Sequence, residues 1–339
     1  MAIKWSWAFG TETPTVLEEM GWDWQNTSAG AVSTTETYTY VGSPVRRSMS
    51  QDDPFLGELF RAPTQAWSPQ GWLTTAVYYQ GGTGVTGRTI LSVLGSITNR
   101  SIYVRLNNAA TNTATLYVDN NPKESFTLLP DRWNYIALKY DMGTTTWSGQ
   151  AFLDGVAVTS LYTDPSSAET TGGYFFGGIT NGNFTYHAQA IVYDDTADSG
   201  EIPLFVTRVD PMADTSTVGT WTSTAADNHS ALESPFDSTS YVNNDPTTAG
   251  NDVRVETTNL STQLGTSPTT VAAVTVHTWA TGSGVDGFAA VSDNNTVYTA
   301  GNTITPSVNA TYSYATDNSQ PSGGPWTSAS NIYYKYEVS

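Results

Sequence analysis

The chain has 339 residues, of which 13 are basic and 31 acidic, so that its formal net charge is −18, and it contains no cysteine. So few cations exclude a large basic face for nucleic acid, and the lack of cysteine excludes disulfides and zinc–thiolate sites. Residues 1–7 lack the apolar run of a signal peptide, and no stretch approaches the roughly 20 apolar residues that cross a bilayer. We therefore expect no nucleic-acid binding, no membrane insertion and synthesis in a cytoplasm.

The best helix signal lies near the start of the chain, where Thr15 and Glu18 have the spacing of a capping box and Gly21 stops the pattern. Elsewhere the dominant hydrophobic period is two, which is typical of half-buried antiparallel strands. The predicted inward-facing residues are Ile102, Val104 and Leu106, then Leu116 and Val118, then Ile136, Leu138 and Tyr140. Turn signals at residues 119–122, 141–143, 154–155 and 181–182 separate the runs and indicate a sandwich or barrel.

A domain boundary is predicted near residue 210, where Asp210-Pro211 interrupts a strand pattern. Residues 1–209 carry a net charge of −8, whereas residues 210–339 carry −10 with only two cations, Arg254 and Lys335. The second part has predicted strands at residues 253–256, 271–279 and 331–338, with Ile332, Tyr334, Tyr336 and Val338 on one face. Its surface is expected to be neutral, rich in hydroxyl groups and weakly adhesive toward acidic polymers.

Residues 101–160 carry the most specific pattern. Trp133 opens the run Asn134-Tyr135-Ile136-Ala137-Leu138, and Phe152-Leu153-Asp154-Gly155 follows a short hairpin. This resembles the laminin-G-like, concanavalin-A-like jelly roll, in which a tryptophan opens a W-x-x-I/V-A-L strand and an L-x-V-D/N-G strand ends in a tight turn. The resemblance covers about residues 1–205. It implies an all-β chain with a jelly-roll sandwich at residues 1–209, followed by a smaller β-sandwich or barrel at residues 210–339.

A second resemblance covers the end of the first part and the start of the next. Ile191-Val192-Tyr193-Asp194-Asp195, followed by Gly200-Glu201-Ile202-Pro203, is similar to the closing strand pair of such domains in tailed-phage virion proteins. Trp221-Thr222-Ser223 and Thr239-Ser240-Tyr241-Val242 resemble the β-domain that often follows them, with Ser223 where that family usually has proline. The resemblance implies a capsid decoration, a head fibre or a tail component.

Catalysis has little support in the residue spacing. Some jelly-roll relatives are glycoside hydrolases, which need two carboxyl groups flanking the scissile bond and carry acidic residues at alternate strand positions. The acidic pairs here are adjacent, and neighbouring strand residues point to opposite faces. They are Glu18-Glu19, Asp52-Asp53 and Asp194-Asp195. We expect no enzymatic activity, with a polysaccharide depolymerase as the less favoured alternative.

Metal and histidine sites are also weakly indicated. Asp194 and Asp195 follow a predicted strand, and some laminin-G-like domains hold one calcium at the sandwich rim. No calcium-loop motif accompanies the two aspartates, so we predict no cofactor and keep a structural calcium there as the alternative. His187, His229 and His277 show no metal-binding or catalytic spacing, which favours hydrogen-bonded structural roles.

Aromatic residues support a glycan-binding hypothesis, since sugar rings stack on exposed tryptophan and tyrosine. The candidates in turn-rich contexts are Trp147, Tyr174 and Trp326, and the alternative for each is packing in the core or in a protein interface.

The preferred hypothesis is a non-enzymatic phage virion protein, exposed on the particle, that acts by binding either its capsid or tail neighbours or a host-surface glycan. Homo-oligomers are the usual outcome for soluble assemblies, and a trimer is the form we expect. A receptor-binding lectin remains the alternative.

Overall fold

A computed structural model describes a defined set of residues. These are residues 3–8, 22–25, 32–34, 46–48, 58–61, 68–79, 87–97, 100–108, 110–176, 185–193, 204, 206, 211–232, 240–244, 248–257, 259, 261–262, 271–282, 285–307, 311–327 and 329–339. The chain divides into two compact units, Met1–Thr207 and Arg208–Ser339. The assignment of residues 1–209 and 210–339 to separate domains stays a prediction. The helix expected at residues 15–21, the turn at residues 181–182 and the three acidic pairs lie outside the described residues.

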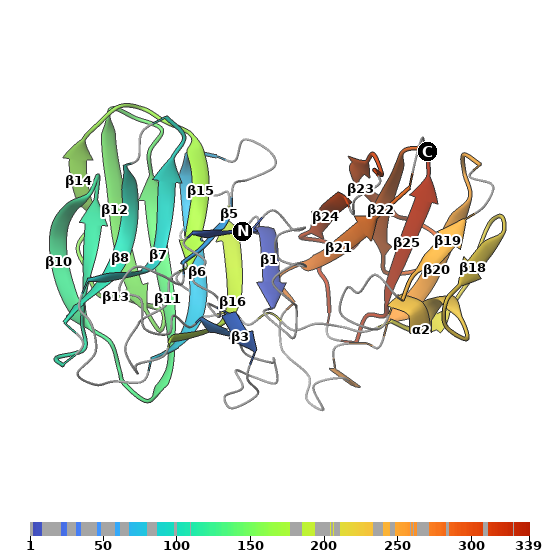
Figure 1. Ribbon diagram of the computed structural model, residues 1–339, viewed down its shortest axis with the longest axis horizontal. Coiled ribbons are helices and arrows are strands. Elements are labelled where there is room, and N and C mark those ends of the chain that lie inside the picture. Colours follow the sequence, from blue (N-terminus) through green and yellow to red (C-terminus); the bar gives the residue numbers. More distant parts are fainter. Residues whose placement is uncertain are drawn as a thin grey trace. The chain divides into compact units, whose positions relative to one another are not determined.

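Strands dominate both units (Figure 1). In the first unit they are β1 (Ile3–Ala8), β2 (Trp22–Gln25), β3 (Val32–Thr34), β4 (Arg46–Ser48), β5 (Glu58–Arg61), β6 (Gln70–Tyr79), β7 (Arg88–Gly95), β8 (Ser101–Asn108), β9 (Thr113–Val118), β10 (Asn121–Thr127), β11 (Arg132–Asp141), β12 (Thr146–Leu153), β13 (Val156–Ala157), β14 (Tyr162–Pro165), β15 (Thr171–Phe176) and β16 (Thr185–Tyr193). In the second unit they are β17 (Pro211–Asp214), β18 (Trp221–Ser223), β19 (Val242–Asn244), β20 (Asp252–Thr257), β21 (Val274–Ala280), β22 (Gly287–Ser292), β23 (Thr299–Ile304), β24 (Thr311–Asp317) and β25 (Ile332–Val338), with the helix α2 (Asn228–Leu232). No helix in the described part of the chain is long and apolar enough to cross a bilayer.

The first unit is a sandwich of two antiparallel sheets. Among the described strands, one sheet has the order β13-β12-β11-β6-β16-β4-β3, with β1 added to β16 and β14 to β12. The other has the order β10-β9-β8-β7-β15-β5-β2. Along the described strands, the chain changes sheet after β1, β2, β4, β5, β6, β10, β14 and β15, so strands distant in sequence pair with each other. The predicted all-β fold class with a jelly-roll sandwich is confirmed.

The core of this sandwich lies between the two sheets and is built from alternating residues, as predicted. Ile102, Val104 and Leu106 of β8 are fully buried, whereas Tyr103 and Arg105 between them are partly exposed. Ile136, Leu138 and Tyr140 of β11 and Leu116 and Val118 of β9 are buried as well. The hydroxyls of Tyr140 and Tyr174 meet across the sandwich at 3.1 Å. The period-two pattern therefore identified the inward face of β8 correctly, whereas Tyr135 and Ala137 on the other side of β11 are buried too.

Two predicted turns have the backbone geometry that their residues favour. Asp119 and Asn120 join β9 to β10 with φ angles of 52° and 62°, and Asp154 and Gly155 join β12 to β13 with 50° and 85°. Two successive positive φ angles are required by the type I′ turn, whose twist matches that of the flanking strands. These hairpins fix the register of the strands beside them.

The second unit has a smaller sheet with the order β17-β20-β25-β22-β23, together with the two-stranded ribbons β18-β19 and β21-β24. Val291, Trp326 and Ile332 form a buried cluster, against which Val274 and Val276 of β21 pack. The sheet therefore has one face on this core. Residues of β25 alternate as predicted, because Tyr334 is paired with Val255 and Val291 on that same face.

Candidate binding site

The three aromatic residues predicted to stack on sugars are buried. Trp147 is 0% exposed, Tyr174 1% and Trp326 3%. The Nε1–H group of Trp147 donates to Ser167 O at 2.7 Å, and that of Trp326 donates to Asp317 O at 3.1 Å. The predicted exposure of these rings is therefore wrong. Strand alternation directs Trp147 of β12 and Tyr174 of β15 into the core, and Trp326, between β24 and β25, packs in the cluster with Val291 and Ile332. Their role is packing, which was the alternative for each of them.

Asp194 and Asp195, the predicted calcium ligands, lie outside the described residues. The histidines behave as the sequence predicted. His187 Nδ1 lies 3.0 Å from Thr75 Oγ1 and His277 Nδ1 lies 2.7 Å from Tyr312 Oη, so both imidazoles have hydrogen-bond partners within their sheets. Hydrogen bonds of this kind hold the rings in place without implying catalysis.

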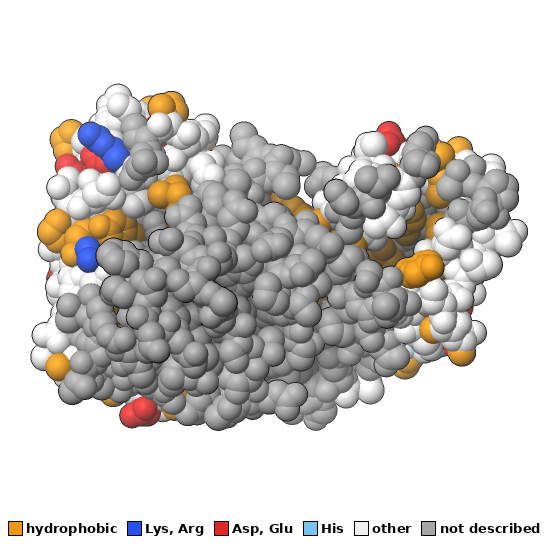
Figure 2. Space-filling view, viewed as in Figure 1, with side chains coloured by type: hydrophobic (Ala, Val, Ile, Leu, Met, Phe, Trp, Pro, Cys, Tyr) orange, Lys and Arg blue, Asp and Glu red, His pale blue; other side chains and the backbone are white. Residues whose placement is uncertain are grey.

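An ordered set of polar and aromatic side chains covers the outward side of β8, β9 and β10. We call it the polar–aromatic face, and its members are Tyr103, Arg105, Asn107, Thr115, Tyr117 and Ser125. Ladder pairing places Tyr103 beside Tyr117 and Arg105 beside Thr115, and Thr115 is paired in turn with Ser125 on β10. In the space-filling view, hydrophobic side chains form a band with a basic side chain below it, over the strands that Figure 1 labels β8 and β10 (Figure 2).

The two tyrosines of this face form its aromatic part. Their rings are stacked, with centroids 4.5 Å apart and planes inclined by 5°. The guanidinium carbon of Arg105 lies 6.0 Å from the centroid of the Tyr117 ring, at the outer limit of a cation–π contact. Burial raises the pKa of Tyr103, and Arg105 offsets this only in part, so the phenol stays protonated at neutral pH. The pair therefore offers apolar ring edges together with the protonated hydroxyl of Tyr103.

Hydrogen bonds hold the polar members of the face. The Tyr117 hydroxyl donates to Asn107 Oδ1 at 3.3 Å, and Asn107 Nδ2 donates to Thr115 Oγ1 at 2.6 Å. Thr115 Oγ1 lies 2.7 Å from Ser125 Oγ. Because the network crosses three strands, its side chains lose little freedom when a ligand binds, which is what a preorganised binding surface requires.

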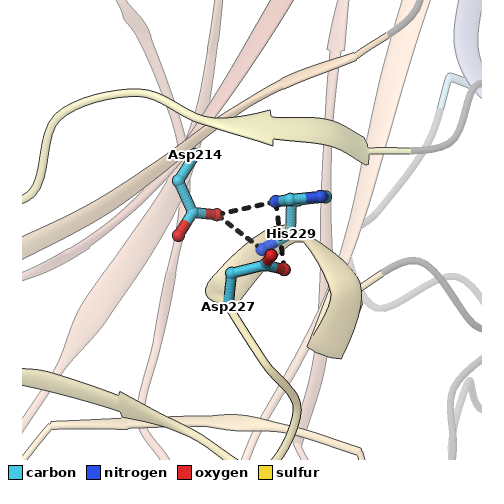
Figure 3. A group of neighbouring side chains, drawn as sticks. All are labelled: Asp214, Asp227 and His229. Carbon is cyan, nitrogen blue, oxygen red and sulfur yellow. Dashed lines mark hydrogen bonds and ion pairs between the residues drawn. The ribbon is translucent and has the colours of Figure 1, made fainter.

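A second group of polar side chains lies at the start of α2 and includes residues that could hold a metal ion (Figure 3). His229 Nδ1 is 3.2 Å from Asp214 Oδ1 and 3.1 Å from Asp227 Oδ1. The backbone N–H groups of Asn228 and His229 donate to Asp214 at 3.0 and 2.6 Å, and that of Ser230 donates to Asp227 Oδ1 at 2.9 Å. Capping of the helix by two aspartates thus accounts for this geometry.

A third group lies on the outward face of the sheet in the second unit. Arg254 and Lys335, the two cations noted beyond residue 209, are directly opposite each other on β20 and β25. Arg254 binds Asp252 and Lys335 binds Glu337, each at 2.6 Å. Both cations also lie near the ring of Tyr298, at 5.4 and 4.7 Å. Each cation is thus neutralised by a carboxylate on its own strand, and we interpret the group as cross-strand packing that stabilises the sheet.

Comparison of this chain with protein-family models and with curated proteins finds no match. Solved structures with similar folds include the cellulose-induced protein Cip1, with 11% identity, 57% of this chain and 98% of that chain covered, and a TM-score of 0.44. Lectin II from Ulex europaeus has 11% identity, coverages of 56% and 98%, and a TM-score of 0.37. The CBM40 of a Ruminococcus gnavus IT-sialidase, bound to alpha2,3 sialyllactose, has 16% identity, coverages of 40% and 81%, and a TM-score of 0.29. Similarity at this level supports no conclusion about the ligand of this chain.

The sequence did not predict the polar–aromatic face as a site. The alternation did indicate that Tyr103 and Arg105 point outward from β8. What the sequence lacked was the register between β8, β9 and β10, which brings Tyr103 to Tyr117 and Arg105 to Thr115.

Proposed function

We propose that this chain is a non-enzymatic structural protein of a bacteriophage particle that binds a host-surface glycan through its polar–aromatic face. The observation that carries the glycan part is the stacked pair Tyr103 and Tyr117 within a hydrogen-bonded polar network. Saccharides are recognised by aromatic surfaces that pack against C–H groups, combined with fixed polar groups that bind hydroxyls. The face offers both in one place.

A binding role is favoured over hydrolysis by the composition of the same face. Glycoside hydrolases require two carboxyl groups on either side of the scissile bond. None of the six residues of the face is acidic, and Glu124 on β10 accepts a hydrogen bond from the backbone of Ser160 at 2.8 Å. An assay for reducing sugars released from host polysaccharide tests this point, and sustained release of oligosaccharides would assign a depolymerase instead.

The virion setting is supported by the resemblance at residues 191–203 and 221–242. In that setting the protein forms a homo-oligomer, with a trimer as the expected form, and contacts other virion proteins. Mass spectrometry of purified heads and tails, separated from each other, tests the location. Stoichiometric copies in one fraction support the proposal, and absence from both fractions would overturn it.

The glycan experiment compares the intact protein with variants on an array of host polysaccharides. Tyr117→Ala removes the stacked ring and is expected to weaken binding by roughly tenfold, whereas Tyr117→Phe keeps the ring and retains most of the affinity. Tyr241→Ala is the matched control, because Tyr241 is 52% exposed and lies on the second unit. Equal binding by Tyr117→Ala and the unaltered protein would show that the face is not the binding surface.

A further inference from the structure

Arg105 differs from five other basic side chains in its electrostatic environment. Each of the five contacts a carboxylate at 3.0 Å or less: Arg100 with Asp119, Lys123 with Asp164, Arg132 with Asp154, Arg254 with Asp252 and Lys335 with Glu337. Arg105 has no carboxylate of the described part of the chain within ion-pair distance. In a protein with 31 acidic and 13 basic residues, an arginine without an acidic neighbour is unexpected.

The position of this guanidinium is defined by its neighbours. Gly87, at the start of β7, leaves the space that the guanidinium occupies, because a β-carbon there would lie 2.5 Å from Arg105 Nη2. The same group lies near the Tyr117 ring, and the side chain is partly exposed. The planar fork of a guanidinium in this position matches a carboxylate with two parallel hydrogen bonds.

Within the part of the chain that the structure describes, the surroundings of Arg105 offer hydroxyl groups to a ligand and place no carboxylate within ion-pair distance. The exposed hydroxyl residue Ser125 of β10 and the protonated Tyr103 of β8 belong to the same face as Arg105. Thr115, which pairs with Arg105, is only 3% exposed, and its Oγ1 is already bonded to Asn107 and Ser125. The acidic side chains described on β10, on β14 and in the β9–β10 turn are engaged elsewhere: Glu124 with Ser160, Asp164 with Lys123 and Asp119 with Arg100. A neutral sugar would leave the charge of Arg105 uncompensated, whereas a carboxylate would neutralise it.

We propose that the polar–aromatic face selects an acidic saccharide, with the carboxylate of a uronic-acid-type or sialic-acid-type residue bound to Arg105 and its ring against Tyr117. This inference rests on the proposed glycan binding and specifies its ligand class. The net charge of −18 repels acidic polymers at long range, but at physiological salt this repulsion is screened beyond about 8 Å. Binding is therefore confined to the site that holds an uncompensated cation, which favours specific over general adhesion.

The test is affinity electrophoresis of the full chain at physiological salt, in gels that contain alginate, polygalacturonate or polysialic acid. Each polymer is paired with its carboxyl-reduced, neutral form. We expect retardation by at least one acidic polymer and a dissociation constant roughly ten- to a hundredfold higher for the matching neutral form, which is the range for a hydrogen bond to a charged group.

Two variants assign the effect to Arg105. Arg105→Gln is expected to lose the preference for the acidic form, and Arg105→Lys is expected to keep only part of it, because an ammonium lacks the planar fork. Arg100→Gln is the matched control: it removes the same charge from the residue just before β8, and the Arg100 side chain is 49% exposed. Equal losses in Arg105→Gln and Arg100→Gln would overturn the proposal, since general charge would then explain the binding.

The remaining outcomes separate this inference from the proposed function. Equal binding of neutral and acidic forms, still sensitive to Tyr117→Ala, would overturn the acidic ligand while supporting a glycan-binding face. Retardation by poly-glutamate as strong as by the acidic polysaccharides would overturn the saccharide in favour of an acidic polypeptide. No retardation by any polymer, acidic or neutral, would count against both proposals.

Discussion

Gly149 of β12 lies so close to Ile102 of β8, across the sandwich, that a β-carbon at position 149 would come within 2.8 Å of the Ile102 methyl carbon Cγ2. The same atom would lie 3.0 Å from a methyl group of Val118. Real side chains do not pack at such distances, so the two sheets can approach here only because residue 149 has no side chain. This contact sets the spacing of the sheets beneath the polar–aromatic face.

Gly149→Ala is therefore expected to lower the free energy of unfolding of the first unit by about 1–3 kcal/mol, the usual cost of overpacking a core. Denaturant unfolding followed by tryptophan fluorescence measures the change. Ser148→Ala, at the adjacent position on the opposite side of β12, is the control and is expected to change stability by less than about 0.5 kcal/mol. A neutral Gly149→Ala would show that the sheets are farther apart than described.

The turn at Asp154 provides a second prediction. This residue has a φ of 50°, and its Oδ1 accepts the backbone N–H of Tyr135 at 2.9 Å. Its Oδ2 binds Arg132 at 2.6 Å. Asp154→Ala removes both contacts and places alanine at a positive φ, so we expect a loss of about 1–3 kcal/mol in denaturant unfolding.

Asp154→Asn is the matched variant for this turn. Asparagine keeps an oxygen acceptor and tolerates the left-handed conformation, so it is expected to retain most of the stability. If Asp154→Asn and Asp154→Ala were equally unstable, the ion pair with Arg132 rather than the turn geometry would be the cause.

The cap of α2 predicts sensitivity to acid. Hydrogen bonds from Ser230, aided by the nearby His229, hold the pKa of Asp227 below its ordinary value. A depressed carboxyl pKa stabilises the folded state at a pH above the unfolded pKa, near 4, and this stabilisation is lost as the pH falls through the folded pKa. Asp227→Asn is therefore expected to lower the denaturant midpoint at neutral pH, with a difference from the unaltered protein that shrinks below about pH 4. A pH-independent difference would contradict this assignment.

Tyr334 predicts the opposite, alkaline response. Burial raises the pKa of Tyr334 to about 12, and its hydroxyl lies 3.2 Å from Thr278 Oγ1. A raised tyrosine pKa contributes stability below the unfolded pKa, near 10, and that stability disappears as the pH rises through the folded value. We expect a titration followed by tyrosinate absorbance to show one fewer tyrosine with a pKa above 10 in Tyr334→Phe than in the unaltered protein.

Stability measurements complete the test of Tyr334. Tyr334→Phe is expected to lose about 1 kcal/mol at neutral pH, from the missing hydrogen bond, and to show a shallower decline above pH 10. An unchanged alkaline titration curve would show that the Tyr334 hydroxyl is open to water.

Much of the fold followed from local chemistry. The alternation in β8, β9 and β11 identified which residues face the core, because a strand places successive side chains on opposite sides. Asp119-Asn120 and Asp154-Gly155 identified two hairpins, because these residues accept positive φ angles at low cost. The short helix α2, by contrast, was not predicted. Its five residues carry no hydrophobic period, and one of its caps comes from Asp214, which lies on strand β17.

The sequence by itself determined the fold class, the inward faces and the unusual charge, because these depend on residue order alone. Only the tertiary structure decided which aromatic faces are covered, and it buried Trp147, Tyr174 and Trp326. It also decided that Arg105 lies beside two stacked tyrosines, with no carboxylate of the described residues within ion-pair distance. The physical reason is that a period of two shows which residues share a face, whereas strand register and sheet packing determine what lies opposite that face.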